Sequence, residues 1–137
     1  MEIVLRKTEK EFEFIANNGI ADIPIIGAHA KTEDLIGFRP MEMLLTSLAG
    51  CMSIDILSIL YKQKQSITNF SVKTIGQRSD GIPSVFENIA LEISINGNVE
   101  ERKIQRAIDL SVQKYCSVYH MLNPLTKITC KYILSNE

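Results

Sequence analysis

The chain has 137 residues, of which 45% are hydrophobic and 23% are charged, and its formal net charge is −1. These values are typical of a single globular domain, residues 1–137, with a hydrophobic core of its own. The balanced charge and the scattered basic residues argue against partners such as nucleic acid or a membrane surface.

The N-terminal part predicts a small unit of short strands. Residues 1–16 alternate between apolar and polar side chains on both sides of a charged turn, which is typical of a β-hairpin. Residues 17–19 (NNG) predict a further turn. Residues 23–26 predict a third strand, in which Pro24 favours an edge or irregular position. The polar residues 28–38 predict a loop that leads into the next element.

Residues 40–63 predict a long helix that begins at Pro40, where the missing N–H of proline costs nothing. Its apolar residues lie on nearly all sides, and a helix that is apolar all round is expected to be buried all round. Residues 41–60 are also long enough to cross a membrane. Glu42, Asp55 and several hydroxyl side chains favour a buried core helix instead.

The predicted compartment is the cytoplasm, because charges throughout residues 1–10 leave no recognisable export signal. The cytoplasm is reducing, so the three cysteines do not predict a framework of structural disulfides.

The second half of the chain predicts strands 70–78 and 85–95, joined by a turn at Asp80-Gly81. One face of the second strand carries Ile89, Leu91, Ile93 and Ile95. Asn98 is the expected cap of a second helix. The inner face of that helix is predicted to hold Ile104, Ala107, Ile108, Ser111, Val112 and Tyr115.

Asn123-Pro124 ends the helical region, and residues 127–134 predict a last strand. The inward positions of this strand are Ile128, Cys130, Tyr132 and Leu134. The order of strands, central helix, strands, helix and strand predicts an α+β fold.

The three cysteines differ in their surroundings. Cys130 lies in the inward register of the last strand, where a free cysteine serves as a small apolar side chain. Cys51 follows Gly50 inside the long helix, and a helical glycine costs about 1 kcal/mol relative to alanine. This cost indicates close approach of a backbone or ligand, or tight helix packing. Cys116 lies where the second helix ends. The residues alone do not decide whether Cys51 and Cys116 are structural, as packed core side chains, or functional, as reactive thiols.

The spacing of the cysteines and histidines gives little support for a metal site or for a protease-like Cys/His pair. His120 lies four residues after Cys116, but His29 is the only other histidine and no CxxC or HxxxH pattern is present. We therefore expect no metal and no other cofactor. A Cys/His nucleophile would also need an orienting partner, which nothing in the sequence marks.

A redox pair would need an activated thiolate and a second thiol that resolves the oxidised form. Asp55 lies one helical turn after Cys51 and would oppose ionisation of that thiol if it were close and charged. A positive partner is therefore required, and Arg6 and Arg39 are the only arginines before residue 78.

Two segments together resemble a known family. The sequence RPMEMLLTSLAGCMSIDILSIL, from Arg39, is followed by LSVQKYCSVYHML, from Leu110. This pair resembles the OsmC/Ohr family of thiol-dependent peroxidases, and in particular the OsmC-like branch whose helix reads P-x-E-L-L-L-x-x-L-A-G-C. The resemblance continues through SDGIPSVFENIALEISINGN and covers roughly residues 35–134.

The resemblance implies a two-layer α+β fold in which antiparallel strands wrap a long buried helix within an intertwined homodimer. It implies that Cys51 is the peroxidatic cysteine and that Cys116 resolves its sulfenic acid as a disulfide. The implied substrate is an organic hydroperoxide or hydrogen peroxide, and the implied reductant is a dithiol. The implied role is defence against oxidative stress.

The family pattern also includes a glutamate ten residues before the first cysteine, which organises the thiolate together with an arginine. Here Glu42 lies nine residues before Cys51, about 180° away around an ideal helix. Glu42 is thus expected to reach the partner subunit's site or to occupy the first helical turn, where a carboxylate is favourable. Arg39 is the first candidate for the arginine and Arg6 the second.

Functions of different classes stay open at this point. The first is a two-cysteine peroxidase. The second is a non-enzymatic dimer of the same fold that binds a small apolar or thiol ligand, which the changed glutamate spacing favours. A redox sensor or an inert relative of the family is a third.

Overall fold

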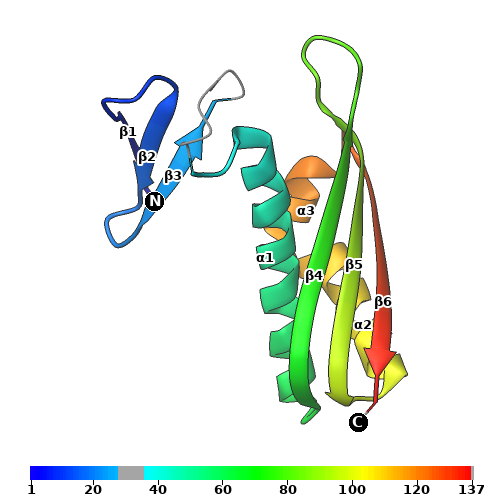
Figure 1. Ribbon diagram of the computed structural model, residues 1–137. Helices are drawn as coiled ribbons and strands as arrows, with labels where there is room; N and C mark the ends of the chain where they lie inside the picture. The colour runs from blue at the N-terminus through cyan, green and yellow to red at the C-terminus, as the bar shows by residue number, and fades with distance from the viewer. Residues whose placement is uncertain (28–35, 137) are drawn as a thin grey trace. The chain divides into compact units, whose positions relative to one another are not determined.

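The computed structural model describes residues 1–27 and 36–136, and its contacts divide the chain into two compact units, Met1–Leu44 and Leu45–Glu137 (Figure 1). The prediction of a single domain therefore stays a prediction. Most of the predicted loop 28–38, together with His29, lies outside the described residues.

The first unit contains the predicted hairpin and third strand. Strands β1 (Val4–Lys7), β2 (Glu13–Asn17) and β3 (Asp22–Ile26) form an antiparallel sheet in the order β1-β2-β3. In the turn after β2, the Asn17 side chain accepts a hydrogen bond from the Gly19 N–H at 2.7 Å. Gly19 has a φ of 90°, a conformation that favours glycine. Pro24 lies on the edge strand β3, as expected.

Helix α1 (Pro40–Lys62) begins at the predicted proline. The chain buries one stripe of it completely, at every fourth residue: Leu48, Met52, Ile56 and Leu60. Other apolar side chains stay exposed, with Ile54 at 70% and Tyr61 at 56%. By length and composition alone α1 could also cross a membrane. Its fully buried stripe favours the reading as a core helix.

The second unit is built on a sheet with the order β4-β5-β6, formed by β4 (Ser66–Arg78), β5 (Phe86–Asn98) and β6 (Lys127–Ser135). Strands β4 and β5 are antiparallel, but β5 and β6 are parallel. The expectation of antiparallel strands is wrong for this last pair. The helices between β5 and β6 carry the chain back to the starting end of β5, and such a crossover joins parallel strands.

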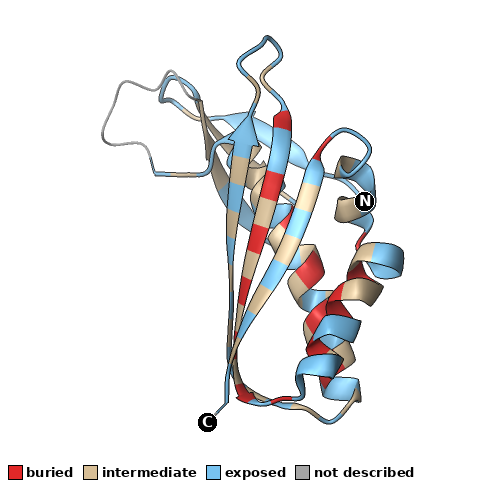
Figure 2. Cartoon of the chain, turned by 90° about the vertical axis from the view of Figure 1, so that its right-hand side faces the viewer, coloured by how far each residue is buried: buried red, intermediate tan, exposed pale blue. Residues whose placement is uncertain are grey.

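The core lies between this sheet and the helices. Figures 1 and 2 show the helices of the second unit on one face of the sheet, which makes two layers. From Ile89 onward strand β5 alternates between buried and more exposed residues, and its inward residues are buried as predicted: Ile89, Leu91, Ile93 and Ile95. Inward residues of β6 are only partly buried, because β6 lies at the edge of the sheet.

The second helical region has three segments: α2 (Glu101–Leu110), the π-helical turn η1 (Ser111–Tyr115) and α3 (Ser117–Leu122). Asn98 is not the cap of α2, because β5 extends through Asn98, which pairs with Ser66. Glu100 takes the N-cap position without a side-chain hydrogen bond. The inner face is buried as predicted at Ile104, Ala107, Ile108 and Ser111. Tyr115 is 47% exposed, because the wider η1 turn shifts the periodicity.

Candidate redox site

Cys116 is presented by an irregular stretch of backbone. The N–H of Cys116 donates to the Ser111 carbonyl at 2.8 Å, which is the five-residue spacing of a π-helix. Cys116 itself is extended, with φ −74° and ψ 100°, and forms the N-cap of α3. Its Sγ accepts a hydrogen bond from the Tyr119 N–H at 3.3 Å. The π-helical turn therefore ends the helix at the residue where the thiol has to turn inward.

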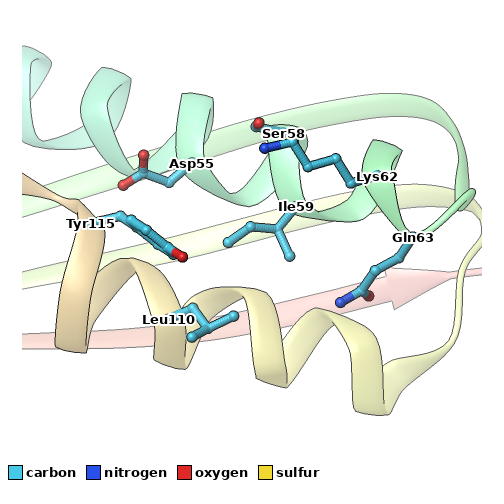
Figure 3. A pocket seen from close by; sticks show the side chains of 7 residues that line it. All are labelled: Asp55, Ser58, Ile59, Lys62, Gln63, Leu110 and Tyr115. Atoms are coloured by element: carbon cyan, nitrogen blue, oxygen red, sulfur yellow. The ribbon is translucent and has the colours of Figure 1, made fainter.

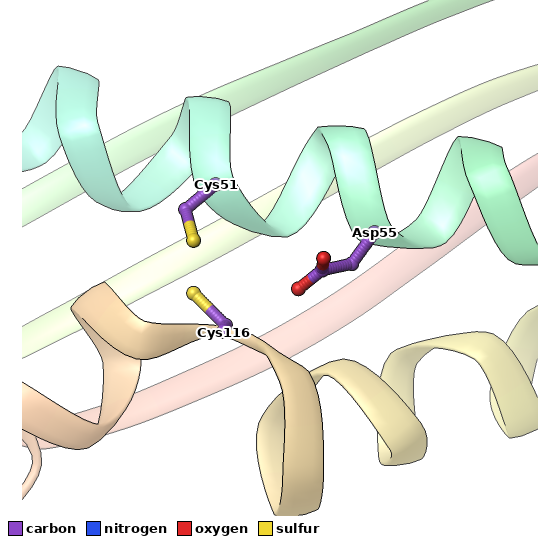
Figure 4. Close-up of side chains that lie close together, drawn as sticks. All are labelled: Cys51, Asp55 and Cys116. Carbon is purple, nitrogen blue, oxygen red and sulfur yellow. The ribbon is translucent and has the colours of Figure 1, made fainter.

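Cys51 and Cys116 face one another across the space between α1 and the end of η1 (Figure 4). Asp55 lies one turn after Cys51 on α1, and its carboxylate points towards the same space. The two sulfurs and a carboxylate oxygen all lie within 4.8 Å of one another. All three cysteines are free thiols, Cys116 is buried and Cys51 is only partly so. The structure thus brings together the two cysteines that the sequence singled out.

A hydroxyl group fixes the carboxylate of this cluster. Ser111 Oγ donates to Asp55 Oδ2 at 2.9 Å, and the Ser111 side chain is completely buried. Sequence reasoning placed Ser111 on the inner face of the helix but missed its contact with Asp55. Nothing in the spacing reveals a pair of residues that are 56 positions apart.

The surroundings hold the proton on Cys116. Burial, the largest cause, and a hydrogen bond with Cys51 together raise the pKa of its thiol to about 12. The charge of Asp55 also raises this pKa, while the Tyr119 N–H opposes the shift. Burial likewise raises the pKa of Cys130, on β6, to about 11. Neither thiol is a nucleophile at neutral pH without a further change in its surroundings.

Glu42 occupies the first helical turn, which is one of its two expected places, and its role at a partner subunit's site stays a prediction. It lies in the first turn of α1, where its Oε2 accepts a hydrogen bond from the Arg39 backbone N–H at 2.8 Å. Nine residues of helix correspond to a rise of about 14 Å between Glu42 and Cys51. The two do not meet within one chain. Arg39 and Arg6 are exposed, and the prediction that one of them activates Cys51 stays a prediction.

Gly50 does not mark a close approach within the chain. A Cβ added there would meet nothing within 4 Å among the described residues, and Gly50 is exposed. The expectation of tight packing at Gly50 is therefore not met by any of the described residues. His120 donates its backbone N–H to the Cys116 carbonyl at 3.1 Å, and its exposed side chain is not a member of the Cys51–Asp55–Cys116 cluster.

A pocket of about 280 Å³ begins at Asp55 and runs between α1 and the α2–η1 segment (Figure 3). Its apolar lining comes from Ile59, Leu110 and the ring of Tyr115. Its polar lining includes Lys62 and Gln63, and Gln63 Oε1 is buried without a hydrogen-bond partner in the described part of the chain. Asp55 belongs to both the thiol cluster and the pocket. A small amphipathic ligand in the pocket would therefore lie beside the two thiols.

Comparison with known proteins identifies the family to which this chain belongs. A family model described as OsmC-like protein matches residues 31–131, so the chain belongs to the OsmC-like family. It is 39% identical to the protein YhfA of Escherichia coli strain K12 over 94 residues, which are 68% of this chain and 70% of that protein.

Solved structures agree with this assignment. A hypothetical protein from Aquifex aeolicus VF5 has a TM-score of 0.89 at 29% identity, covering 99% of this chain and 96% of that one. The organic hydroperoxide resistance protein OhrB of Bacillus subtilis has a TM-score of 0.66 at 13% identity, with 96% of each chain covered, and shares the fold. The family resemblance of the sequence is confirmed, and family membership supports a redox role related to peroxides.

Proposed function

We propose that the protein is a thiol-dependent peroxidase that reduces organic hydroperoxides with Cys51 and Cys116, in defence against oxidative stress. The observation that carries this proposal is the approach of the two sulfurs to within 4.8 Å in a partly buried site. A disulfide needs two cysteines whose side chains point towards one another, and the sulfurs of Cys51 and Cys116 do so.

A two-step reaction would give the two thiols different roles. In the first step the Cys51 thiolate attacks the peroxide, the O–O bond breaks, and Cys51 becomes a sulfenic acid while the alkoxide leaves and takes up a proton. In the second step the Cys116 sulfur attacks the Cys51 sulfur, and an S–S bond forms as water leaves. A dithiol then reduces the disulfide by exchange. The high pKa of Cys116 suits the second role, since this thiol stays reduced until a sulfenic acid forms beside it.

The pocket supports an organic substrate. Its volume of about 280 Å³ is far more than hydrogen peroxide fills, because a water molecule takes about 30 Å³. Ile59, Leu110 and Tyr115 would hold a hydrocarbon part. The unpartnered Gln63 Oε1 would accept a hydrogen bond from a polar group on the substrate. The same pocket is the observation that favours the second candidate, a non-enzymatic binder of a small apolar or thiol ligand.

The test of the proposed function is hydroperoxide consumption by the reduced wild-type protein with a dithiol as electron donor. We expect catalytic turnover of cumene hydroperoxide, at a kcat/KM roughly tenfold or more above that for hydrogen peroxide, because apolar burial adds to binding of the organic substrate. Peptide mapping after one equivalent of peroxide should find a Cys51–Cys116 disulfide and reduced Cys130. Consumption no faster than in protein-free buffer would leave the binder as the better reading.

We also propose that the protein works as a homodimer. Gly50, Ile54 and Tyr61 lie on one side of α1, within about 40° of one another around the helix axis, and all three are exposed. Ile54 near the middle of α1 and Tyr61 in its last turn form an exposed apolar face that a second chain would cover. The missing Cβ of Gly50 would let a partner backbone approach that face closely.

Ile54→Glu is expected to turn the dimer into a monomer. Burying Ile54 contributes about 1.5–3 kcal/mol, and a buried unpaired carboxylate costs more than that gain. Sedimentation velocity at micromolar concentration measures the change. Ile82→Glu is the matched control, because Ile82 lies fully exposed in the β4–β5 loop, and it should stay dimeric. A wild-type chain that sediments as a monomer under these conditions would refute the dimer.

A further inference from the structure

Cys51, Asp55 and Cys116 together form a donor set for a metal ion. Two thiols and one carboxylate become anionic ligands once their protons are displaced, and zinc binds such sulfur and oxygen ligands in tetrahedral sites. The sequence pointed away from a metal because no CxxC or clustered histidine is present. Instead, the carboxylate of Asp55 lies on the same helix as Cys51, one turn further on. The second thiol is that of Cys116, the residue that directly follows η1 (Figure 4).

The distances between these ligand atoms are close to those around an ion with tetrahedral coordination. With Zn–S near 2.3 Å and Zn–O near 2.1 Å, ligand atoms around one ion lie about 3.5–3.8 Å apart. Here the three ligand atoms lie within 4.8 Å of one another. Side-chain adjustments of about 1 Å bring all three to bonding distance. Three protein ligands leave the fourth position for water, as in an open zinc site.

Groups outside the cluster already orient two of its ligands. Ser111 Oγ donates to Asp55 Oδ2 at 2.9 Å, which leaves Oδ1 for an ion. The Tyr119 N–H donates to Cys116 Sγ at 3.3 Å and so supports negative charge on that sulfur. Supporting contacts of this kind fix ligand orientation in metal sites. Ser111 is completely buried, and the π-helical turn that begins at this residue also places Cys116.

We propose that the reduced protein binds one thiophilic divalent cation, of the Zn²⁺ class, through Cys51, Asp55 and Cys116, and that oxidation of the two cysteines releases it. The release step, unlike the binding step, rests on the proposed function. The two thiolates give two electrons to a hydroperoxide, an S–S bond forms and the O–O bond breaks. Two protons from solvent complete the alcohol and the water, and the cation leaves with its charge unchanged. A disulfide offers no thiolate ligand, so metal binding and oxidation exclude one another.

The test uses Co²⁺ as a coloured substitute for Zn²⁺ on the full chain, reduced with a phosphine that is then removed under anaerobic conditions. We expect a thiolate-to-cobalt charge-transfer band that saturates at one Co²⁺ per chain and disappears when Zn²⁺ is added. Cys51→Ser and Cys116→Ser should each lose at least half of the band. Asp55→Asn and Ser111→Ala should weaken binding roughly tenfold to a hundredfold. Cys130→Ser is the matched control and should bind like wild type.

One measurement needs no variant and so does not depend on the folding of any mutant. Treating the cobalt-loaded wild-type protein with the thiol oxidant diamide should abolish the band, and reduction should restore it. A wild-type protein without a charge-transfer band, or a band that depends on Cys130 and not on Cys51, would overturn the metal site. This readout is independent of turnover, so a protein that consumes peroxide without binding Co²⁺ would refute the metal site alone.

Discussion

Cys51→Ser is expected to lower the rate of hydroperoxide consumption on the order of a thousandfold, to the level of protein-free buffer. Serine keeps the approximate size of the side chain, but its hydroxyl group is a weak nucleophile at neutral pH and cannot replace the thiolate. Cys116 cannot substitute for it, because burial raises the pKa of that thiol to about 12 and keeps it protonated. The measurement is the initial rate with cumene hydroperoxide and a dithiol, at equal protein concentration for all variants.

Cys116→Ser is the informative counterpart of Cys51→Ser. It should keep the first reaction with peroxide and accumulate a sulfenic acid on Cys51, which a dimedone adduct at that residue detects by mass spectrometry. Its steady-state rate should fall less than that of Cys51→Ser, because an external thiol can still reduce the sulfenic acid. Cys130→Ser should behave like wild type. A dimedone adduct on Cys116 in the Cys51→Ser protein would reverse the two assigned roles.

Gly97→Ala is expected to destabilise the fold by about 2–5 kcal/mol. Gly97 has a φ of 136°, which L side chains rarely adopt, and an added Cβ would overlap the backbone carbonyl of Ser66 on β4. Because the obstacle is backbone, the pairing of β4 with β5 has to shift just before α2 begins. Equilibrium denaturant unfolding at one fixed protein concentration measures the loss.

Gly81→Ala provides the control for Gly97→Ala. A Cβ at Gly81 would meet nothing within 4 Å among the described residues, so its effect should stay within about 0.5 kcal/mol. The same result for Gly97→Ala would mean that the β4–β5 pairing relaxes around a side chain without cost.

Helices and strands could be predicted where the local sequence pattern points to the same structure as the packing of the folded chain. The alternation in β5 gave its buried face, and Pro40 gave the start of α1, because side-chain periodicity and proline geometry act within a few residues. The predictions for Asn98 and Tyr115 were wrong. Pairing with Ser66 extends β5 through Asn98 and displaces the expected helix cap. The π-helical turn at Ser111 moves Tyr115 away from the inner face towards the pocket.

The sequence by itself determined the family and the α+β class, and it singled out Cys51 and Cys116 because each lies inside an extended motif. It could not determine what surrounds them. Asp55 and Ser111 are 56 residues apart, and only the packing of α1 against the α2–η1 segment brings them to 2.9 Å. The pocket between these segments arises in the same way. Distances between residues remote in the chain depend on how apolar faces pack, and packing belongs to the tertiary structure and not to any local pattern.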